Sequence, residues 1–331
     1  MDAATLHDSL VVIDGHCDTA IPAAGFDFKS QPVQPLDLCA RNETGHVDFP
    51  RLLEGGVTAQ FFALFTDTVF VPKAREHTYR LLDAVESAVD RSSGRARLAV
   101  KAADVAAAKR GGTLAAFLSI EGGEAIGESL DDLRAFYARG VRLMTLTWNR
   151  INAIGRGAEN PGPDGLTPFG LRVVAEMERL GMIVDASHLC DRALDELLAV
   201  ARRPVVASHS NARAVCDHRR NLADAQAERI AATGGLVAVT FAGVFVDPDP
   251  EKVTVERVLD HVDHLASVVG AEHVGLGTDF DGFSAPYGLV MPDCSHLPEL
   301  TAGLLRRGRS EAEIGMIMGG NWLRVIEDVV G

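Results

Sequence analysis

The sequence predicts an α/β fold, a (β/α)8 or TIM barrel with insertions at its C-terminal face. Short apolar runs rich in β-branched residues recur eight times, and amphipathic stretches of helical length lie between them. Glycine often stands where a helix would end before the next run, at Gly56, Gly140, Gly181 and Gly235. This alternation is typical of a parallel sheet, and eight units favour closure into a barrel.

The expected strands are nearly continuous in apolar residues, as strands buried on both faces are. In chain order they are Leu10–Ile13, Val57–Phe65, Leu114–Ile120, Val141–Thr147, Met182–Ala186, Pro204–Ser208, Leu236–Phe241 and His273–Gly277. The clearest amphipathic helices are Tyr79–Val89, Leu130–Arg139, Leu171–Leu180 and Val255–Val269. A doubly wound open sheet uses the same alternation and is the structural alternative.

Two segments interrupt this rhythm. Residues 21–50 hold four prolines among many polar residues, and residues 153–168 are rich in glycine and proline. Each follows an expected strand, so in a barrel each would lie at the C-terminal face, where catalytic loops are found. No internal repeat, low-complexity tract or linker divides the sequence, and we expect one domain over residues 1–331.

Composition narrows the class of partner. The net charge of −14, from 46 acidic and 32 basic residues, disfavours nucleic acid and anionic membrane surfaces. Five scattered cysteines without a CxxC motif argue against a disulfide framework and favour a reducing compartment. The sequence shows no signal peptide, no lipid-anchor signal and no apolar stretch of the roughly 18 residues that span a bilayer. We therefore expect a cytoplasmic protein.

Side chains suited to metal binding lie at the ends of five expected strands. They are His16 and Asp18 after the first strand, Glu121 after the third, His188 after the fifth, His209 after the sixth and Asp279 after the eighth. A single histidine at a strand end is more often a hydrogen-bonded structural residue than a ligand. Six such residues at one end of a barrel are hard to obtain from core filling, so we expect them to converge near its axis.

The chemistry of this set points to a pair of divalent cations. Imidazole and carboxylate are good ligands for zinc-like ions, and a carboxylate shared by two ions gives the arrangement used for hydrolysis. Glu121 is the natural bridge because its strand lies between the two clusters. His16 and Asp18 are two residues apart and so point to the same side of an extended segment. A hydroxide between the ions would then be the nucleophile.

Other candidates receive a structural interpretation. Asp14 and Asp281 suit a helix cap or a partner behind the ligands. Glu124 and Glu128 are expected to be solvated or capping. A thiolate role for Cys17 or Cys190 is set aside, because Cys is commonly a small buried hydrophobe.

In combination, these motifs resemble those of the renal (membrane) dipeptidase family of the amidohydrolase superfamily, in its bacterial-type, soluble form. The matching segments are residues 13–18, 55–62, 120–123, 146–149, 185–188, 208–212, 219–221, 275–282 and 321–325. The likeness extends from about residue 10 to residue 327. It implies the (β/α)8 fold, two zinc ions and cleavage of dipeptides.

The resemblance also implies roles for individual residues. His16, Asp18, Glu121 and Asp279 would surround the first zinc, and Glu121, His188 and His209 the second. Asp279 would act as general base and then acid, passing a proton to the leaving amine. Arg220 matches the arginine that anchors the terminal carboxylate of the dipeptide, a role suited to a guanidinium. The alternative for Arg220 is a surface or helix-capping arginine, as expected for Arg219.

Two positions depart from the mammalian members of that family. Trp148 replaces a histidine that helps to stabilise the oxyanion there, so Asn149 or Asn152 would donate that hydrogen bond, or the metal alone would carry the charge. Phe245 replaces a tyrosine that faces the substrate. The reaction class is therefore better defined than the substrate.

The leading hypothesis is a binuclear-zinc dipeptidase that acts on dipeptides, including L-Xaa-D-Xaa dipeptides. The alternative enzyme hydrolyses another small amide, lactam, lactone or ester with the same centre. A metal-binding barrel that has lost catalysis is the hypothesis from a different class, and the complete ligand set argues against it. The resemblance also suggests a homodimer.

Overall fold

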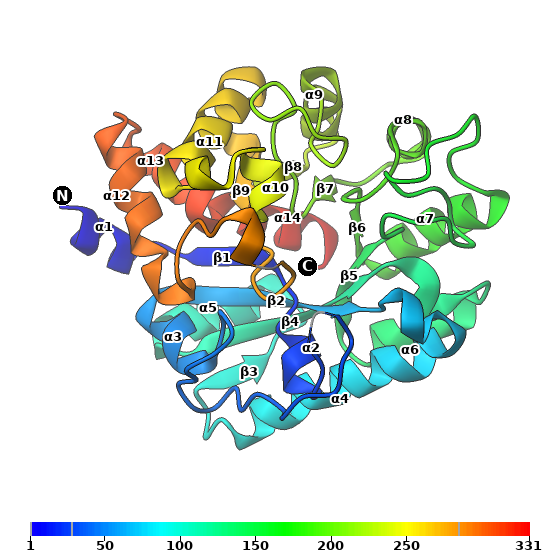
Figure 1. Cartoon of the computed structure of the whole chain (residues 1–331), viewed down its shortest axis with the longest axis horizontal. Helices are drawn as coiled ribbons and strands as arrows, with labels where there is room; N and C mark the ends of the chain where they lie inside the picture. Colours follow the sequence, from blue (N-terminus) through cyan, green and yellow to red (C-terminus); the bar gives the residue numbers. More distant parts are fainter. Residues whose placement is uncertain (1, 28, 284) are drawn as a thin grey trace.

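The computed structural model describes residues 2–27, 29–283 and 285–331, and its centre is a closed barrel of parallel strands surrounded by helices (Figure 1). The ring consists of β1 (Val12–Cys17), β2 (Val57–Phe65), β4 (Leu114–Glu121), β5 (Val141–Thr145), β6 (Ile183–Asp185), β7 (Val205–Ala207), β8 (Leu236–Val239) and β9 (Val274–Leu276). The ring closes because β9 pairs with β1, and β2 pairs with β4 over seven residue pairs. The predicted (β/α)8 barrel is confirmed, and the open doubly wound sheet is wrong.

Two strands differ from the sequence prediction. β1 continues through Cys17, beyond the expected end at Ile13, so that His16 lies inside the strand. The polar Asp14 and the following glycine hide this continuation from a search for apolar runs. The short strand β3 (Ala96–Leu98) is not predicted at all. It pairs with the first half of β4, and two of its three residues are exposed, so it lacks an apolar signature.

Helices cover the outside of the barrel. They are α1 (Ala3–Ser9), α2 (Ala20–Ala23), α3 (Phe49–Glu54), α4 (Ala74–Arg91), α5 (Ala102–Gly111), α6 (Leu130–Ala138), α7 (Pro168–Leu180), α8 (Asp191–Val200), α9 (Asp224–Ala232), α10 (Gly243–Val246), α11 (Val255–Val269), α12 (Pro298–Arg306), α13 (Glu311–Gly315) and α14 (Asn321–Val329). Among the described residues, none of these helices combines the length and apolar content needed to cross a bilayer.

Local sequence signals explain where α7 begins and ends. The Thr167 side chain accepts a hydrogen bond from the Gly170 backbone, and Pro168 occupies the first turn. Gly181 ends the helix with a φ of 76°, a left-handed conformation that favours glycine. The expected cap at Gly235 is wrong, because the left-handed residue there is Gly234, with a φ of 84°. Gly235 is instead packed against β7, where a Cβ would lie 1.7 Å from the carbonyl oxygen of Val205.

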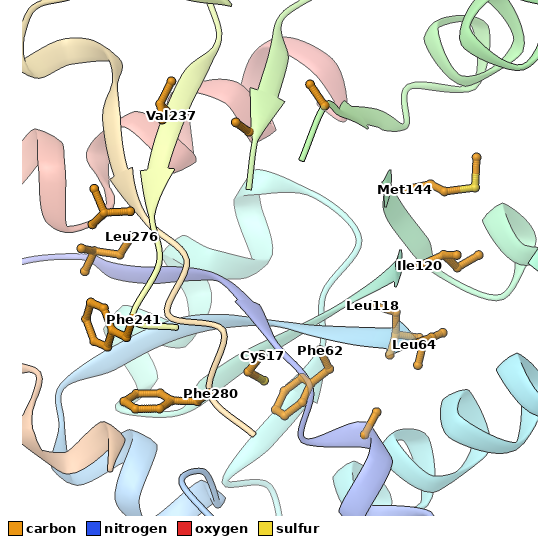
Figure 2. Close-up of a cluster of buried hydrophobic side chains, with 14 of the residues drawn as sticks. Cys17, Phe62, Leu64, Leu118, Ile120, Met144, Val237, Phe241, Leu276 and Phe280 are labelled. Atoms are coloured by element: carbon orange, nitrogen blue, oxygen red, sulfur yellow. The ribbon is translucent and has the colours of Figure 1, made fainter. Parts of the chain in front are cut away.

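The strands divide the core into two layers. Side chains such as Phe62, Leu118 and Leu276 point outward and pack beneath the helices (Figure 2). Alternate residues, including Phe61 and Phe117, point into the barrel and stack with ring centroids 4.7 Å apart. This alternation follows from the two-residue period of a strand.

The last helix, α14, closes the N-terminal end of the barrel. Its Trp322 is fully buried, and the indole Nε1 donates a hydrogen bond of 2.8 Å to the backbone carbonyl of Leu276. The indole occupies the space beside Gly15, where a Cβ would lie 2.0 Å from the ring. The opposite, C-terminal end of the barrel is therefore the end that remains available for a site.

Candidate metal centre

The six predicted ligands come together at the C-terminal end of the barrel. His16 is in β1 with Asp18 just beyond it, Glu121 is the last residue of β4, and the other three follow β6, β7 and β9. All six side chains are buried, although every one of them is ionisable in water: His16, Asp18, Glu121, His188, His209 and Asp279. Burial of so many ionisable groups requires pairing or a bound ion.

Glu121 lies between two groups of ligands. Its Oε1 is 2.9 Å from Nε2 of His188 and 3.7 Å from Nε2 of His209. Its Oε2 is 3.6 Å from Nε2 of His16, which is in turn 3.6 Å from Oδ2 of Asp18. The two oxygens of one carboxylate thus face different sets of residues, as a bridging ligand does.

The hydrogen bonds of His188 and His209 determine which ring nitrogens are free. Nδ1 of His188 lies 2.7 Å from Oδ1 of Asn149, whose Nδ2 donates to Glu159, so Nδ1 carries the proton. Nδ1 of His209 lies 2.7 Å from Oγ of Ser208, a hydroxyl that already donates its proton to Asp185. Both Nε2 atoms therefore present lone pairs.

These two lone pairs face each other. Nε2 of His188 and Nε2 of His209 are 2.7 Å apart, with the Glu121 carboxylate beside them. Burial lowers the pKa of both imidazoles well below the ordinary value, which keeps them in the neutral form that binds metal. Two lone pairs and a carboxylate directed at one point repel one another unless a cation lies among them.

The other group shows unpartnered atoms. Both ring nitrogens of His16 and Oδ1 of Asp18 are buried without a hydrogen-bond partner in the described chain. Such atoms are costly and indicate a ligand. A Cβ at Gly282 would lie 2.1 Å from Oδ2 of Asp18 and 2.4 Å from Oδ1 of Asp279, so glycine keeps the space beside these carboxylates open. The residues present fit a pair of divalent cations such as zinc.

The carboxylates are crowded in the absence of a cation. Burial raises the pKa of Asp18 to about 6, and the charge of Glu121 adds to the rise. Burial also raises the pKa of Asp279 well above its ordinary range, with the charge of Asp18 as the next cause. Burial acts to lower the pKa of His16, but the charges of Glu121 and Asp18 outweigh it and the pKa is raised. Bound cations would relieve this repulsion.

The backbone at two of the predicted ligands is strained. His188 and Asp279 have φ values of 69° and 64°, in the left-handed region that few non-glycine residues adopt. At Asp279 the conformation is held because its N–H donates to the carbonyl of His16, across the β1–β9 seam. Strain of this kind is concentrated at functional sites, where the surrounding structure stabilises it.

Two buried aspartates support the ligand-bearing segments. Asp14 accepts hydrogen bonds from the backbone of His16 and from the backbone and hydroxyl of Thr278, which precedes Asp279. Asp14 therefore lies behind the ligands, as expected. Asp185 does the same on the other side of the barrel and accepts from the backbone N–H groups of Ser187 and Ser208. Sequence reasoning overlooked Asp185, although its position just before a ligand histidine resembles that of Asp14.

A cavity of about 310 Å³ opens above these ligands, within the range of small-molecule sites. Its floor includes Asp18, Glu121, His188 and Asp279. The walls are mainly apolar, and they include Ile21, Phe65, Trp148, Phe245 and Phe283. Trp148 and Phe245 thus line the cavity, as their assignment to the pocket requires.

The two asparagines considered as oxyanion donors have different surroundings. Asn149 lines the cavity, but its Oδ1 is hydrogen-bonded to His188 and its Nδ2 to Glu159, so it orients the His188 ring. Asn152 is not among the cavity-lining residues. Its Nδ2 donates to Glu124 and its Oδ1 accepts from the backbone of Ile154, so the structure uses Asn152 to shape its own loop.

Glu124 corrects another expectation. Its side chain is only 5% exposed rather than solvated, and its Oε1 accepts a hydrogen bond of 2.7 Å from Nε of Arg150. The sequence separation of these two residues gives no local signal for the pair.

Arg220 is buried beside His209 and is not itself among the residues that line the cavity. Its Nη1 and Nη2 make long hydrogen bonds of 3.5 and 3.3 Å to Ser210 and to the carbonyl of His209, and its Nε has no partner. No carboxylate of the described chain forms an ion pair with it. Burial lowers the pKa of Arg220 to about 10, which still leaves it charged at neutral pH. A buried guanidinium without a counter-charge is suited to bind an anion.

A parallel barrel with a buried histidine–carboxylate cluster at its C-terminal face defines a metal-dependent hydrolase of the amidohydrolase type. Residues 1–330 match the sequence profile of the membrane dipeptidase family, peptidase family M19. The chain is 36% identical to dipeptidase tcpJ of Claviceps purpurea (strain 20.1), over 96% of this chain and 76% of that protein. It is 34% identical to dipeptidase verJ of Clonostachys rogersoniana, over 96% and 84% of the two chains.

Solved structures of two metallopeptidases share the fold of this chain. Dipeptidase AC, a metallopeptidase of family M19, superposes with a TM-score of 0.85 at 30% identity, over 98% of this chain and 99% of that one. A metallopeptidase from Rhodobacter sphaeroides, bound to a phosphinate mimic of the dipeptide L-Ala-D-Ala, gives a TM-score of 0.84 at 29% identity, over 97% and 99%. The chain belongs to the membrane dipeptidase family, and it is a metal-dependent dipeptidase.

Proposed function

We propose that this enzyme hydrolyses dipeptides with two zinc ions that share Glu121. The observation that carries the proposal is the position of the Glu121 carboxylate. One oxygen faces the lone pairs of His188 and His209, and the other faces His16, whose neighbours are Asp18 and Asp279. His16, Asp18 and Asp279 would complete the first site, and the two remaining histidines the second. When bound, such ions lower the pKa of water and polarise a carbonyl.

Asp279 would carry the proton of the attacking water to the leaving amine. Its Oδ2 is 3.5 Å from the hydroxyl of Thr240, and its Oδ1 lies 3.9 Å from Nε2 of His16, toward the cluster. A buried carboxylate with a raised pKa accepts a proton more readily than a solvated one. Asp279 would take the proton of the attacking water at this oxygen and give it to the leaving amine.

Arg220 would hold the C-terminal carboxylate of the dipeptide. Its guanidinium is charged and lacks an ion-pair partner in the described chain, and its Cζ lies 5.3 Å from the centre of the Phe245 ring. A carboxylate there would supply the missing counter-charge. This anchor explains why a free dipeptide, rather than an internal peptide bond, would be the substrate.

The proposal includes L-Xaa-D-Xaa dipeptides, which is supported by the ligand of the Rhodobacter structure, a mimic of L-Ala-D-Ala. The test is a panel of dipeptide stereoisomers, N-acyl amino acids and lactones, assayed with zinc-loaded protein whose metal content is measured. Turnover of dipeptides with about two zinc ions per chain is expected. Turnover confined to the other compounds would favour the alternative amidohydrolase, and two bound ions without any turnover would favour a non-catalytic barrel.

The proposal also covers the number of domains and of subunits. Residues 1–331 would form one hydrolase domain, and the resemblance suggests a homodimer. Light scattering coupled to size-exclusion chromatography distinguishes a dimer from a monomer of 35.3 kDa.

A further inference from the structure

One wall of the cavity is aromatic. Trp148, in the loop after β5, and Phe65, the last residue of β2, have ring centroids 5.3 Å apart, and both line the cavity with Ile21. No lysine or arginine is among the cavity-lining residues of the described chain. The wall is therefore suited to an apolar side chain, because a charged one would lose hydration against these rings, and Asp67, which also lines the cavity, would repel a carboxylate.

The strand order relates this wall to Arg220. The ring runs β1, β2, β4, β5, β6, β7, β8, β9, so β7 and β2 lie on opposite sides of it. Arg220 follows β7, and Phe245 follows β8. If the dipeptide carboxylate is at Arg220, its C-terminal residue lies on that side. The N-terminal residue, beyond the scissile bond, then extends toward Phe65 at the end of β2.

Arg150 holds Trp148 in place. Its Cζ lies 5.0 Å from the centre of the indole, a cation–π arrangement. Its guanidinium donates to Glu124 at 2.7 Å, to the hydroxyl of Thr68 at 2.6 Å and to the carbonyl of Thr66. These contacts tie the loops after β2, β4 and β5 together. Through its cation–π contact with Trp148, this largely buried ion pair supports the aromatic wall.

We propose that Phe65 and Trp148 form the subsite for the N-terminal side chain of the dipeptide, that this subsite prefers an aromatic or large aliphatic residue, and that Arg150 is its positioning residue. The inference rests on the proposed function, because the anchor at Arg220 sets the direction of the substrate. Burial of a phenyl ring against the wall favours Phe over Ala at the N-terminal position by about tenfold or more in kcat/KM.

The experiment uses zinc-loaded, full-length enzyme and a series of dipeptides with one fixed C-terminal residue. The N-terminal residue is Phe, Leu, Ala, Lys or Glu, and kcat/KM is measured for each. Phe and Leu are expected to exceed Ala by about tenfold, and Lys and Glu to fall below it. Equal values for all five, or a preference for Lys or Glu, would overturn the subsite. Turnover of none would overturn the proposed function itself.

Two variants test the residues. Trp148→Ala is expected to reduce the Phe-to-Ala ratio of kcat/KM toward one, and an unchanged ratio would remove Trp148 from the subsite. Arg150→Met is expected to reduce the same ratio, mainly through a higher KM for the Phe dipeptide. Arg150→Lys, which keeps the charge but not the planar donors, serves if Arg150→Met fails to fold.

The chain provides a matched control for Arg150. Arg142, near the N-terminal end of β5, lies with its Cζ 4.1 Å from the centre of the Tyr137 ring and donates to the carbonyls of Val100, Tyr137 and Val141. Arg142→Met removes a similar set of contacts far from the cavity. Its Phe-to-Ala ratio should equal that of the wild type. If both arginine variants lower the ratio equally, general destabilisation explains the effect and the positioning role of Arg150 is wrong.

Discussion

The side-chain amide of Asn221 donates a hydrogen bond of 2.9 Å to the backbone carbonyl of Phe245. The same carbonyl also accepts from Asn211, and the next one, of Val246, lies 2.9 Å from Nε2 of His261. Three buried side chains thus cap the end of the four-residue helix α10, which carries Phe245. Asn221 follows Arg220 directly, so this bond connects the proposed carboxylate anchor to the aromatic ring beside it.

Replacement of Asn221 by Ala is expected to weaken substrate binding. The change removes the bonds to Phe245 and Cys216 and loosens the segment that carries Arg220. Loss of buried hydrogen bonds costs about 1–3 kcal/mol, and part of this cost should appear as a KM increase of about tenfold with a smaller change in kcat. Asn42→Ala, which removes amide bonds to the carbonyls of Asp37 and Ala40, is the control. A large fall in kcat at constant KM would contradict a positioning role for Asn221.

Asp279→Asn is expected to abolish turnover and to leave much of the metal bound. The amide retains an oxygen for coordination but cannot accept and return a proton as a carboxylate does. Steady-state rates and metal analysis of the same preparation test both parts. Full activity would exclude Asp279 from proton transfer.

Arg220→Met is expected to raise KM sharply for free dipeptides and hardly at all for dipeptides amidated at the C-terminus. Methionine fills similar space but offers no charge to a carboxylate. A dipeptide amidated at its C-terminus has no carboxylate charge to pair with Arg220, so its binding should change little. Kinetics on matched free and amidated pairs decide the question. An equal loss on both would show that Arg220 supports the fold instead.

His261 should make stability depend on pH. Nδ1 accepts from the backbone of Ala212 and Nε2 donates to Val246, so the folded protein holds the neutral ring. Burial lowers the pKa of His261 to about 4, whereas an unfolded histidine has a pKa of about 6.5. Between these values the unfolded chain binds more protons, so the free energy of unfolding falls as the pH drops from about 6.5 to 4, by up to about 3 kcal/mol.

Denaturant unfolding of the wild type and of His261→Gln, at pH 7 and at pH 4.5, measures this effect. Glutamine does not titrate, so the variant should lose less stability between the two values. His77, with a pKa also lowered to about 4, contributes in the same direction, so some dependence should persist in the variant. Parallel curves for the two proteins would show that His261 is not responsible.

The sequence predicted site residues best where they directly follow a strand. The convergence of the candidate ligands could be predicted because His188, His209 and Asp279 follow apolar runs, and one end of a barrel collects such residues. Asp185 and the Glu124–Arg150 pair escaped because their partners are distant in sequence, and buried polar groups leave no periodic signal. The hydrogen bonds of Asn152 within its own loop leave no signal for a similar reason. An asparagine beside a predicted site reads the same whether its amide faces a substrate or closes its own loop.

The contact between Gly15 and Trp322 has a consequence for how the enzyme is made. The indole that packs against β1 from inside the barrel follows Gly15 in the chain by 307 residues (322 − 15). Until α14 is synthesised, the strand that carries His16 lacks its inner support. Such pairing of the two ends of a chain slows folding, because a long loop must close before the contact forms. The end of β1 that carries His16 thus acquires its final shape only after α14 has been synthesised.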